Sequence, residues 1–262
     1  MLSVKLAWLV LTVGVDLAAE PKGTAVTRVE WGEGRAVVRR VTCPAGDEEI
    51  LAALAEADKA GIDCPLGWPD DFVSFVTAHQ LGAVSVPAGY PAPGWKQRLT
   101  MRLTDQVVKL ETGKTPLSVS ADLIGHVALR CACLLAEYAA RSGQPVDRTG
   151  DGTVAEVYPA ASLRVWGLEP GKYKQRAGAQ QLGALVDQVR QLAPWLDFGD
   201  TEHTCRTRHD AFDAVVAALT ARAAALKDRT LRPRTPEEAA AATREGWVAV
   251  PLRGTSLGQL IK

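Results

Sequence analysis

The sequence has no excess of charge of either sign, because Lys and Arg together number 30 and Asp and Glu together also number 30. Bulk charge therefore gives no support to tight non-specific binding of a polyanion, and a nucleic-acid partner would need a local basic patch. Cysteines are few, at five, and no two form a Cys-x-x-Cys pair. Their odd number and irregular spacing disfavour a zinc site and fit a reducing, cytoplasmic compartment.

Apolar runs of membrane-spanning length are also missing. The run over residues 6–15 (LAWLVLTVGV) is too short for a transmembrane helix, so we expect no membrane partner. Placed after Lys5, it resembles the core of a signal peptide. Its β-branched residues and its direct continuation into Asp16 favour a strand instead. The sequence leaves the oligomeric state open, with a homodimer as one option.

What is present is an ordinary globular composition, with 47% hydrophobic and 23% charged residues, which is enough to bury a core. We expect a single domain over residues 1–262. Hydrophobic patterning and turn signals predict strands and helices in alternation. The predicted strands are 10–18, 23–31, 35–43, 60–64 and 153–158, with 246–252 as a last strand or an extended tail. The predicted helices are 47–59, 118–141, 178–192, 209–226 and 235–244.

The order of the first elements predicts the sheet. The turn signal Gly32-Glu33-Gly34 joins two strands as a hairpin, so the first three strands form an antiparallel meander. The strand at 60–64 follows a helical crossover and should run parallel to the first strand. The class is therefore α/β, a mixed sheet with helices on both faces. Prolines and glycines interrupt the pattern over residues 65–116, which we expect to form an irregular insertion with short helices.

Two carboxylates stand at the ends of predicted strands. Asp16 ends the apolar segment VGVD, and Asp63 lies in GIDCPLG before a turn. A charge at the end of a buried strand is costly unless it faces a cleft or a metal. If the two strands are adjacent and parallel, both carboxylates emerge at the same edge, where open α/β sheets place their ligands.

Two more carboxylates, Asp210 and Asp213, are three residues apart in HDAFDAVVAAL and so lie near one face of a helix. Their position in the first turn is also typical of capping, which needs no function. Together the four aspartates predict a catalytic metal site for Mg²⁺ or Mn²⁺, cations that prefer oxygen ligands. Two such ions roughly 4 Å apart can activate a water and stabilise the leaving oxygen of a phosphodiester.

Other polar residues have two interpretations each. Arg102 and Asp105 could clamp a phosphate or order the insertion. Glu156 could be a further ligand or pair with Arg102 or Lys172. His209 could shuttle a proton or only neighbour a helix cap. The substrate-binding candidates are Arg102, Asp105, Glu156, Lys172, Tyr173, Lys174 and His209, of which Lys172, Tyr173 and Lys174 form a basic-aromatic cluster suited to a phosphate backbone or a stacked base. A solvated loop is the simpler interpretation for Lys174.

The segments GVDLA, GIDCPLG, EVYPA and HDAFDAVVAAL, with RLTD at 102–105 and KYK at 172–174, resemble the family called domain of unknown function 429. That family is itself predicted to be nucleases with a ribonuclease-H fold. The helix pair Asp-x-x-Asp is similar to that of Holliday-junction resolvases, and Asp16 matches their first-strand aspartate. Asp63 departs from their pattern, which often has glutamate there.

The resemblance implies a metal-dependent nuclease that leaves 5′-phosphate ends on nucleic acid, with DNA and RNA unresolved. In this scheme one ion is held by Asp16, Asp63 and Asp213, and a second by Asp16 and Asp210. Two alternatives stay open. One is an ATP-binding module of the actin or sugar-kinase type, although LAAEPKGT after Asp16 fits a phosphate loop poorly. The other is a non-catalytic nucleic-acid-binding protein that retains the fold.

Overall fold

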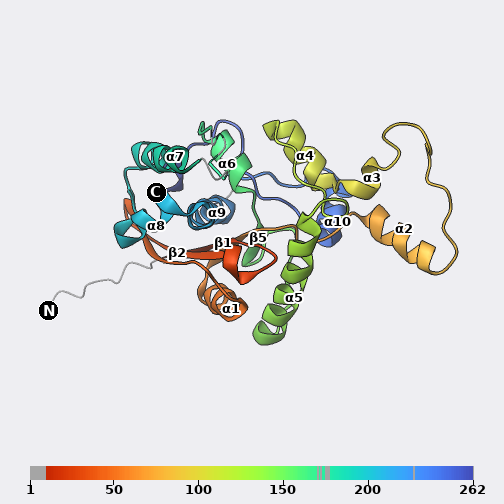
Figure 1. The fold of residues 1–262 in the computed structure, drawn as a ribbon, viewed down its shortest axis with the longest axis horizontal. Coiled ribbons are helices and arrows are strands. Elements are labelled where there is room, and N and C mark those ends of the chain that lie inside the picture. The colour runs from red at the N-terminus through yellow and green to blue at the C-terminus, as the bar shows by residue number, and fades with distance from the viewer. Residues whose placement is uncertain (1–9, 170, 172, 175–177, 227, 262) are drawn as a thin grey trace.

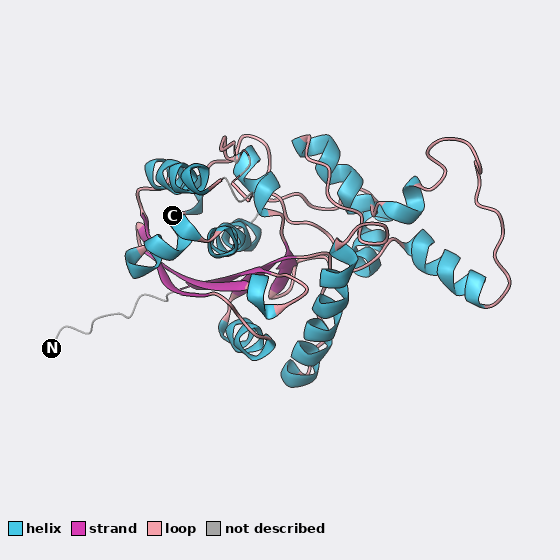
Figure 2. Cartoon of the chain, viewed as in Figure 1, coloured by secondary structure: helices cyan, strands magenta, loops and turns pink. Residues whose placement is uncertain are grey.

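A mixed six-stranded sheet forms the centre of the computed structural model, which describes residues 10–169, 171, 173–174, 178–226 and 228–261 (Figures 1 and 2). The strand order is β5-β4-β1-β2-β3-β6. The strands are β1 (Val10–Asp16), β2 (Ala25–Gly32), β3 (Arg35–Thr42), β4 (Lys59–Asp63), β5 (Val154–Glu156) and β6 (Leu196–Asp197). The predicted strand after Lys5 is confirmed from Val10 onward, and its earlier residues lie outside the described ranges.

The predicted sheet arrangement is confirmed. β1, β2 and β3 form an antiparallel meander, β4 pairs in parallel with β1, and β5 pairs in parallel with β4. In the register of β1 and β4, Asp16 pairs with Asp63. The two-residue β6, which was not predicted, pairs in parallel with β3. This order of antiparallel and parallel strands is consistent with a ribonuclease-H-like fold.

Helices cover both faces of the sheet (Figure 1). The helices are α1 (Asp47–Glu56), α2 (Asp70–Gln80), α3 (Gln97–Thr100), α4 (Leu103–Thr112), α5 (Ile124–Ser142), α6 (Pro159–Val165), α7 (Ala179–Leu192), α8 (Glu202–Thr207), α9 (His209–Ala225) and α10 (Pro236–Glu245). Short 3-10 turns lie at Pro21–Gly23, Gly199–Thr201 and Leu257–Leu260. The apolar core on one face is built by α7 and α9 against β2 and β3, and on the other by α1 and α5 against β1 and β4. Among the described helices, none has the length and apolar character needed to cross a membrane.

The segment over 65–116, predicted as an irregular insertion with short helices, holds α2, α3 and α4. Figure 1 shows α2, α3 and their connecting loop extending away from the sheet. No residue of α2 or α3 is buried, so this arm adds little to the core.

The helix predicted over 118–141 begins later, at Ile124, and this prediction was wrong at its start. Residues before it form a turn in which the Ser118 amide donates to Asp122 and the Ala121 amide donates to the Ser118 hydroxyl. Short polar side chains compete with the helix for backbone groups in this way. The segment 246–252 does not form a full strand, but Val248 bridges Glu156 at the end of β5.

Candidate metal and phosphate site

The site begins where β1 and β4 end side by side. Asp16 and Asp63 are the last residues of these strands and are paired in register. Paired residues of adjacent parallel strands point to the same face of a sheet and lie roughly 4.8 Å apart across it. Two carboxylates are therefore held as neighbours by the sheet itself, as the sequence predicts.

Two glycines bring α9 onto this pair. A Cβ on Gly14 would overlap the backbone of Ala214 and Ala218, and one on Gly61 would lie 2.6 Å from the carbonyl oxygen of Ala217. The backbone of α9 therefore rests directly on β1 and β4, at glycines that lie two residues before Asp16 and two residues before Asp63. A larger side chain at either glycine would push the helix off the strands. This close contact sets the first turn of α9, with Asp210 and Asp213, beside the strand ends.

Asp213 is the most enclosed member of the cluster, with no exposed surface. Its Oδ1 accepts a hydrogen bond of 2.5 Å from the Tyr173 hydroxyl. Its Oδ2 accepts no hydrogen bond from the described residues, and its contact there is an ion pair of 2.6 Å with Nζ of Lys174. Lys174 and Tyr173 were predicted as substrate-binding residues, and the structure places both against this carboxylate.

Crowding of the carboxylates changes their acidity. Burial raises the pKa of Asp16 well above its ordinary value, and the charges of Asp213, Asp63 and Asp210 raise it further, against the opposing effect of Lys174. Burial likewise raises the pKa of Asp63 to about 7, with Lys174 opposing and Asp213 and Glu156 adding to the shift. Asp16 and Asp63 therefore ionise less readily than ordinary aspartates, and a nearby cation would stabilise their charged forms.

Asp210 has other partners. Its carboxylate lies 2.6 Å from the guanidinium of Arg208 and accepts a hydrogen bond from the Cys43 thiol at 3.3 Å. Although burial acts against it, the hydrogen bonds from Arg208 and Cys43 lower the pKa of Asp210. Burial, followed by the charge of Asp210, raises the pKa of the Cys43 thiol to about 12. Arg208 therefore balances the charge of Asp210, and the Asp210 oxygens are not among the converging donor atoms described next.

Three side chains offer donor atoms that converge. One donor atom each from Asp16, His209 and Asp213 lies within 4.8 Å of the other two, a group that could hold a metal ion. From the sequence, His209 was expected to shuttle a proton or only to neighbour a helix cap, and its place among these converging donor atoms was not predicted. The signal was its spacing, since residues four apart on a helix, such as His209 and Asp213, share a face.

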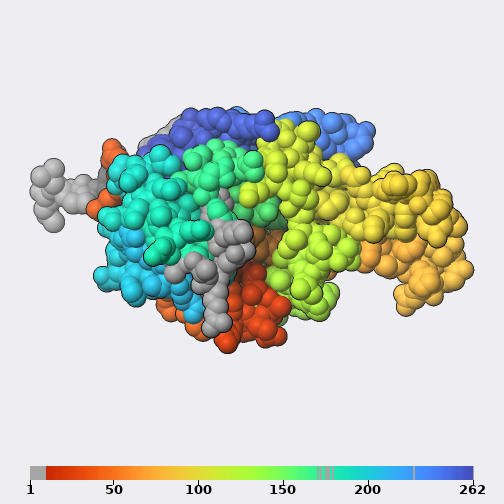
Figure 3. Space-filling view, turned by 45° about the horizontal axis from the view of Figure 1, so that its top comes forward, coloured from red at the N-terminus to blue at the C-terminus, as the bar shows by residue number. Residues whose placement is uncertain are grey.

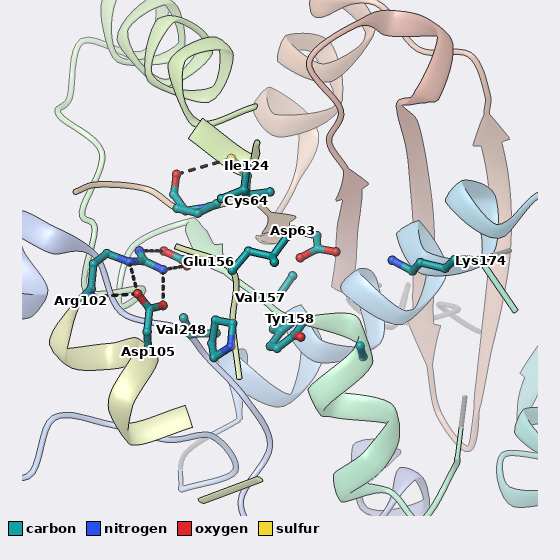
Figure 4. A pocket seen from close by; sticks show the side chains of 14 residues that line it. Asp63, Cys64, Arg102, Asp105, Ile124, Glu156, Val157, Tyr158, Lys174 and Val248 are labelled. Carbon is teal, nitrogen blue, oxygen red and sulfur yellow. Dashed lines mark hydrogen bonds and ion pairs between the residues drawn. The ribbon is translucent and has the colours of Figure 1, made fainter. Parts of the chain in front are cut away.

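The insertion joins the site through a buried ion network (Figure 4). Arg102 is 2% exposed, and all five of its N–H groups donate, to both carboxylate oxygens of Asp105, both of Glu156 and the carbonyl of Glu245. Asp105 also accepts the Arg102 amide at the start of α4. With every donor used inside the protein, Arg102 orders the insertion and has none left for a phosphate. Glu156 likewise pairs with Arg102, one of its two predicted alternatives.

Beside the carboxylates lies a pocket of about 320 Å³. Asp63 and Lys174 stand at one side of it, while Arg102, Asp105 and Glu156 form another (Figure 4). The rest of the lining is mostly apolar and comes from the strand ends, the segment before α5 and the start of α6. Lys172, the remaining candidate, lies outside the described residues.

Comparison with known proteins agrees with these motifs. A family model described as "Protein of unknown function (DUF429)" matches residues 14–238, a span that contains all four aspartates. The chain belongs to the DUF429 family. Neither the curated proteins nor the solved structures gave a match. For this DUF429 member, function must therefore be argued from the site.

Proposed function

We propose that the protein is a metal-dependent nuclease that hydrolyses phosphodiester bonds, with Asp16, Asp213 and His209 as ligands of a divalent cation and Asp63 beside them. The observation that carries the proposal is the convergence of these three donor side chains within 4.8 Å at the end of the sheet. Carboxylate oxygens suit Mg²⁺ and Mn²⁺, and the added imidazole makes Mn²⁺ the better first cation to test.

Two features of the cluster suit a cation, the buried Oδ2 of Asp213 and the partly exposed Lys174 beside it. Asp213 holds a buried oxygen that accepts no hydrogen bond from the described residues, and a lone carboxylate oxygen of this kind is costly without a positive partner. Lys174 already supplies one, since its ammonium is 2.6 Å from that oxygen and its side chain is 47% exposed. A residue with one end in the cluster and a path to solvent can give up its place to a metal ion.

When bound, such a cation supplies a water of lowered pKa and positive charge for the leaving oxygen. The side chains of this protein would orient the reactants. Tyr173 holds Asp213 through its Oδ1 and leaves Oδ2 for the ion. Lys174, once released from Asp213, is the cation best placed to hold a phosphate oxygen beside Asp63. If the two-metal scheme applies, Asp63 and Asp16 would be the residues to hold a second ion. Products would carry 5′-phosphate ends, as the family resemblance implies.

The test is Mn²⁺ binding by calorimetry together with cleavage of labelled DNA and RNA. Wild type should bind Mn²⁺ and cleave, and Asp16→Asn should lose both. Asp200→Asn, at an exposed aspartate that is not one of the converging donors, is the matched control and should behave as wild type. Cleavage that persists in EDTA or in Asp16→Asn would overturn the proposal. Metal and nucleic-acid binding without cleavage would indicate the non-catalytic alternative, and tight binding of ATP the kinase-like one.

A further inference from the structure

The pocket next to Asp63 is a second feature of the site that metal binding does not explain. Its apolar walls come from four separate parts of the chain, the loop after β4, the segment leading into α5, the start of α6 and the segment after α10. The apolar lining residues are Pro65, Pro116, Leu117, Ile124, Val157, Tyr158, Ala160 and Val248. A hollow opens on this face between the yellow-green start of α5 and the red end of β1 (Figure 3). At about 320 Å³ it is at the lower end of the sizes found for small-molecule sites.

The polar groups of the pocket divide into two sets. On one wall, Arg102 donates hydrogen bonds to both Asp105 and Glu156, so these three side chains hold one another in place. Asp63 and Lys174 lie at the opposite side, toward the metal ligands (Figure 4). A ligand that fits this arrangement carries a flat, largely apolar group at one end and a negative charge at the other.

We propose that the pocket holds the base of one unpaired nucleotide, with its phosphate beside Lys174 and Asp63, so that the substrate is single-stranded or locally unpaired nucleic acid. The identity of the ligand rests on the proposed nuclease function. A base that is paired and stacked in a duplex cannot enter a pocket of this kind without leaving the stack. Single-stranded bases are splayed out and bind aromatic and apolar side chains, here the ring of Tyr158 and the side chain of Leu117.

Two further observations favour this substrate class. Leu117 lines the pocket yet is 61% exposed, so a bound base would cover an apolar surface that water now contacts. The protein also carries no net charge, with 30 basic and 30 acidic residues. Its overall charge therefore adds nothing to the affinity that duplex-binding proteins gain through counterion release. Burial of a base can supply affinity that does not depend on that charge.

The test compares binding of a labelled single strand and of the same strand in a full duplex, as DNA and as RNA, with Ca²⁺ replacing Mn²⁺. Fluorescence anisotropy gives both affinities. Wild type should bind the single strand at least about tenfold more tightly, since stacking of one base contributes roughly a factor of ten or more. Leu117→Trp, which fills the pocket, should remove that preference. Leu129→Trp, on α5 with the same 61% exposure but outside the pocket lining, should keep it.

A second variant covers the case in which the new side chain of Leu117→Trp points to solvent instead of into the pocket. Ala160→Phe fills the pocket from the side of α6 and should abolish the preference as Leu117→Trp does. Equal binding of single strand and duplex by wild type, or a preference that survives both substitutions, would overturn the pocket proposal. Mn²⁺ calorimetry separates the two proposals, because both pocket variants should bind the ion as wild type does. A wild type that prefers the single strand, loses this preference in both pocket variants and cleaves nothing would refute the nuclease proposal and leave the pocket proposal standing.

Discussion

Nζ of Lys174 lies 2.6 Å from Oδ2 of Asp213, so a lysine ammonium is the ion-pair partner of the most enclosed aspartate of the cluster. Burial acts to lower the pKa of Lys174, but the charges of Asp213, Asp63 and Asp16 raise it well above its ordinary value. The ammonium therefore stays charged and offsets part of the repulsion among the aspartates. A metal ion must compete with this internal cation for the same oxygen.

Removing the internal cation should strengthen metal binding. In Lys174→Met no ammonium has to be displaced from Asp213, so Mn²⁺ affinity should rise several-fold, and more at low salt, at a pH high enough to ionise Asp16 and Asp63 without the help of Lys174. Calorimetry in wild type and variant measures the change. Lys96→Met, at an exposed lysine on the distant arm, is the control and should leave the affinity unchanged. If Lys174→Met weakens Mn²⁺ binding, Lys174 supports the ion instead of competing with it.

Crowding of Asp16 and Asp63 predicts how the stability of the metal-free protein depends on pH. In the folded state the pKa of Asp63 is about 7, against 3.8 ordinarily, and that of Asp16 is also raised. The folded protein therefore binds more protons than the unfolded chain between these values. The contribution of these groups to stability is fully present below about pH 4 and is lost as pH rises through 7.

Asp63→Asn removes one of these titrations. In EDTA it should be more stable than wild type above pH 7, and the difference should shrink as pH falls toward 4. Thermal unfolding of both proteins across this range measures it. Mn²⁺ should reverse the order for wild type, because it binds the folded state. A difference in midpoint that does not change with pH would contradict the raised pKa of Asp63.

Gly14 should tolerate no side chain. A methyl group there meets the backbone of α9 at Ala214 and Ala218, and neither strand nor helix can move without separating Asp213 from Asp16. Gly14→Ala should therefore destabilise the protein by about 2–4 kcal/mol and weaken Mn²⁺ binding together. Denaturant unfolding and calorimetry measure the two effects. Gly46→Ala is the matched control, since its Cβ would meet nothing within 4 Å.

Sequence patterns predicted the half of the site that strands and helices dictate. Asp16 and Asp63 follow apolar strands joined by one helical crossover, so local periodicity determines both their edge and their register. The same reasoning brought Asp213 to that edge. It could not predict that Asp213 joins the converging donors and Asp210 does not. That difference depends on the contacts of Asp210 with Arg208 and with Cys43, and Cys43 is 167 residues away in the sequence.

Contacts made by loops were beyond prediction for the same reason. The ion pair of Lys174 with Asp213 and the pocket walls join segments that are distant in sequence, and no spacing encodes them. Arg102 and Glu156 show a second limit of prediction from sequence. Their residue types suited a phosphate clamp as well as a buried ion pair, and only the burial of all five Arg102 donors decides between these two interpretations.

The buried network gives the last prediction. Arg102→Leu leaves Asp105 and Glu156 as buried carboxylates without their cation, which should cost about 3–5 kcal/mol of stability. Adding Glu156→Gln removes one of the two stranded charges and should recover part of that loss. Arg102→Lys keeps the charge but has fewer donors than the five in use, so it should also destabilise, by less. Denaturant unfolding of the three proteins measures these differences. A phosphate clamp would give another pattern, in which Arg102→Lys and Arg102→Leu keep wild-type stability and lose only nucleic-acid affinity.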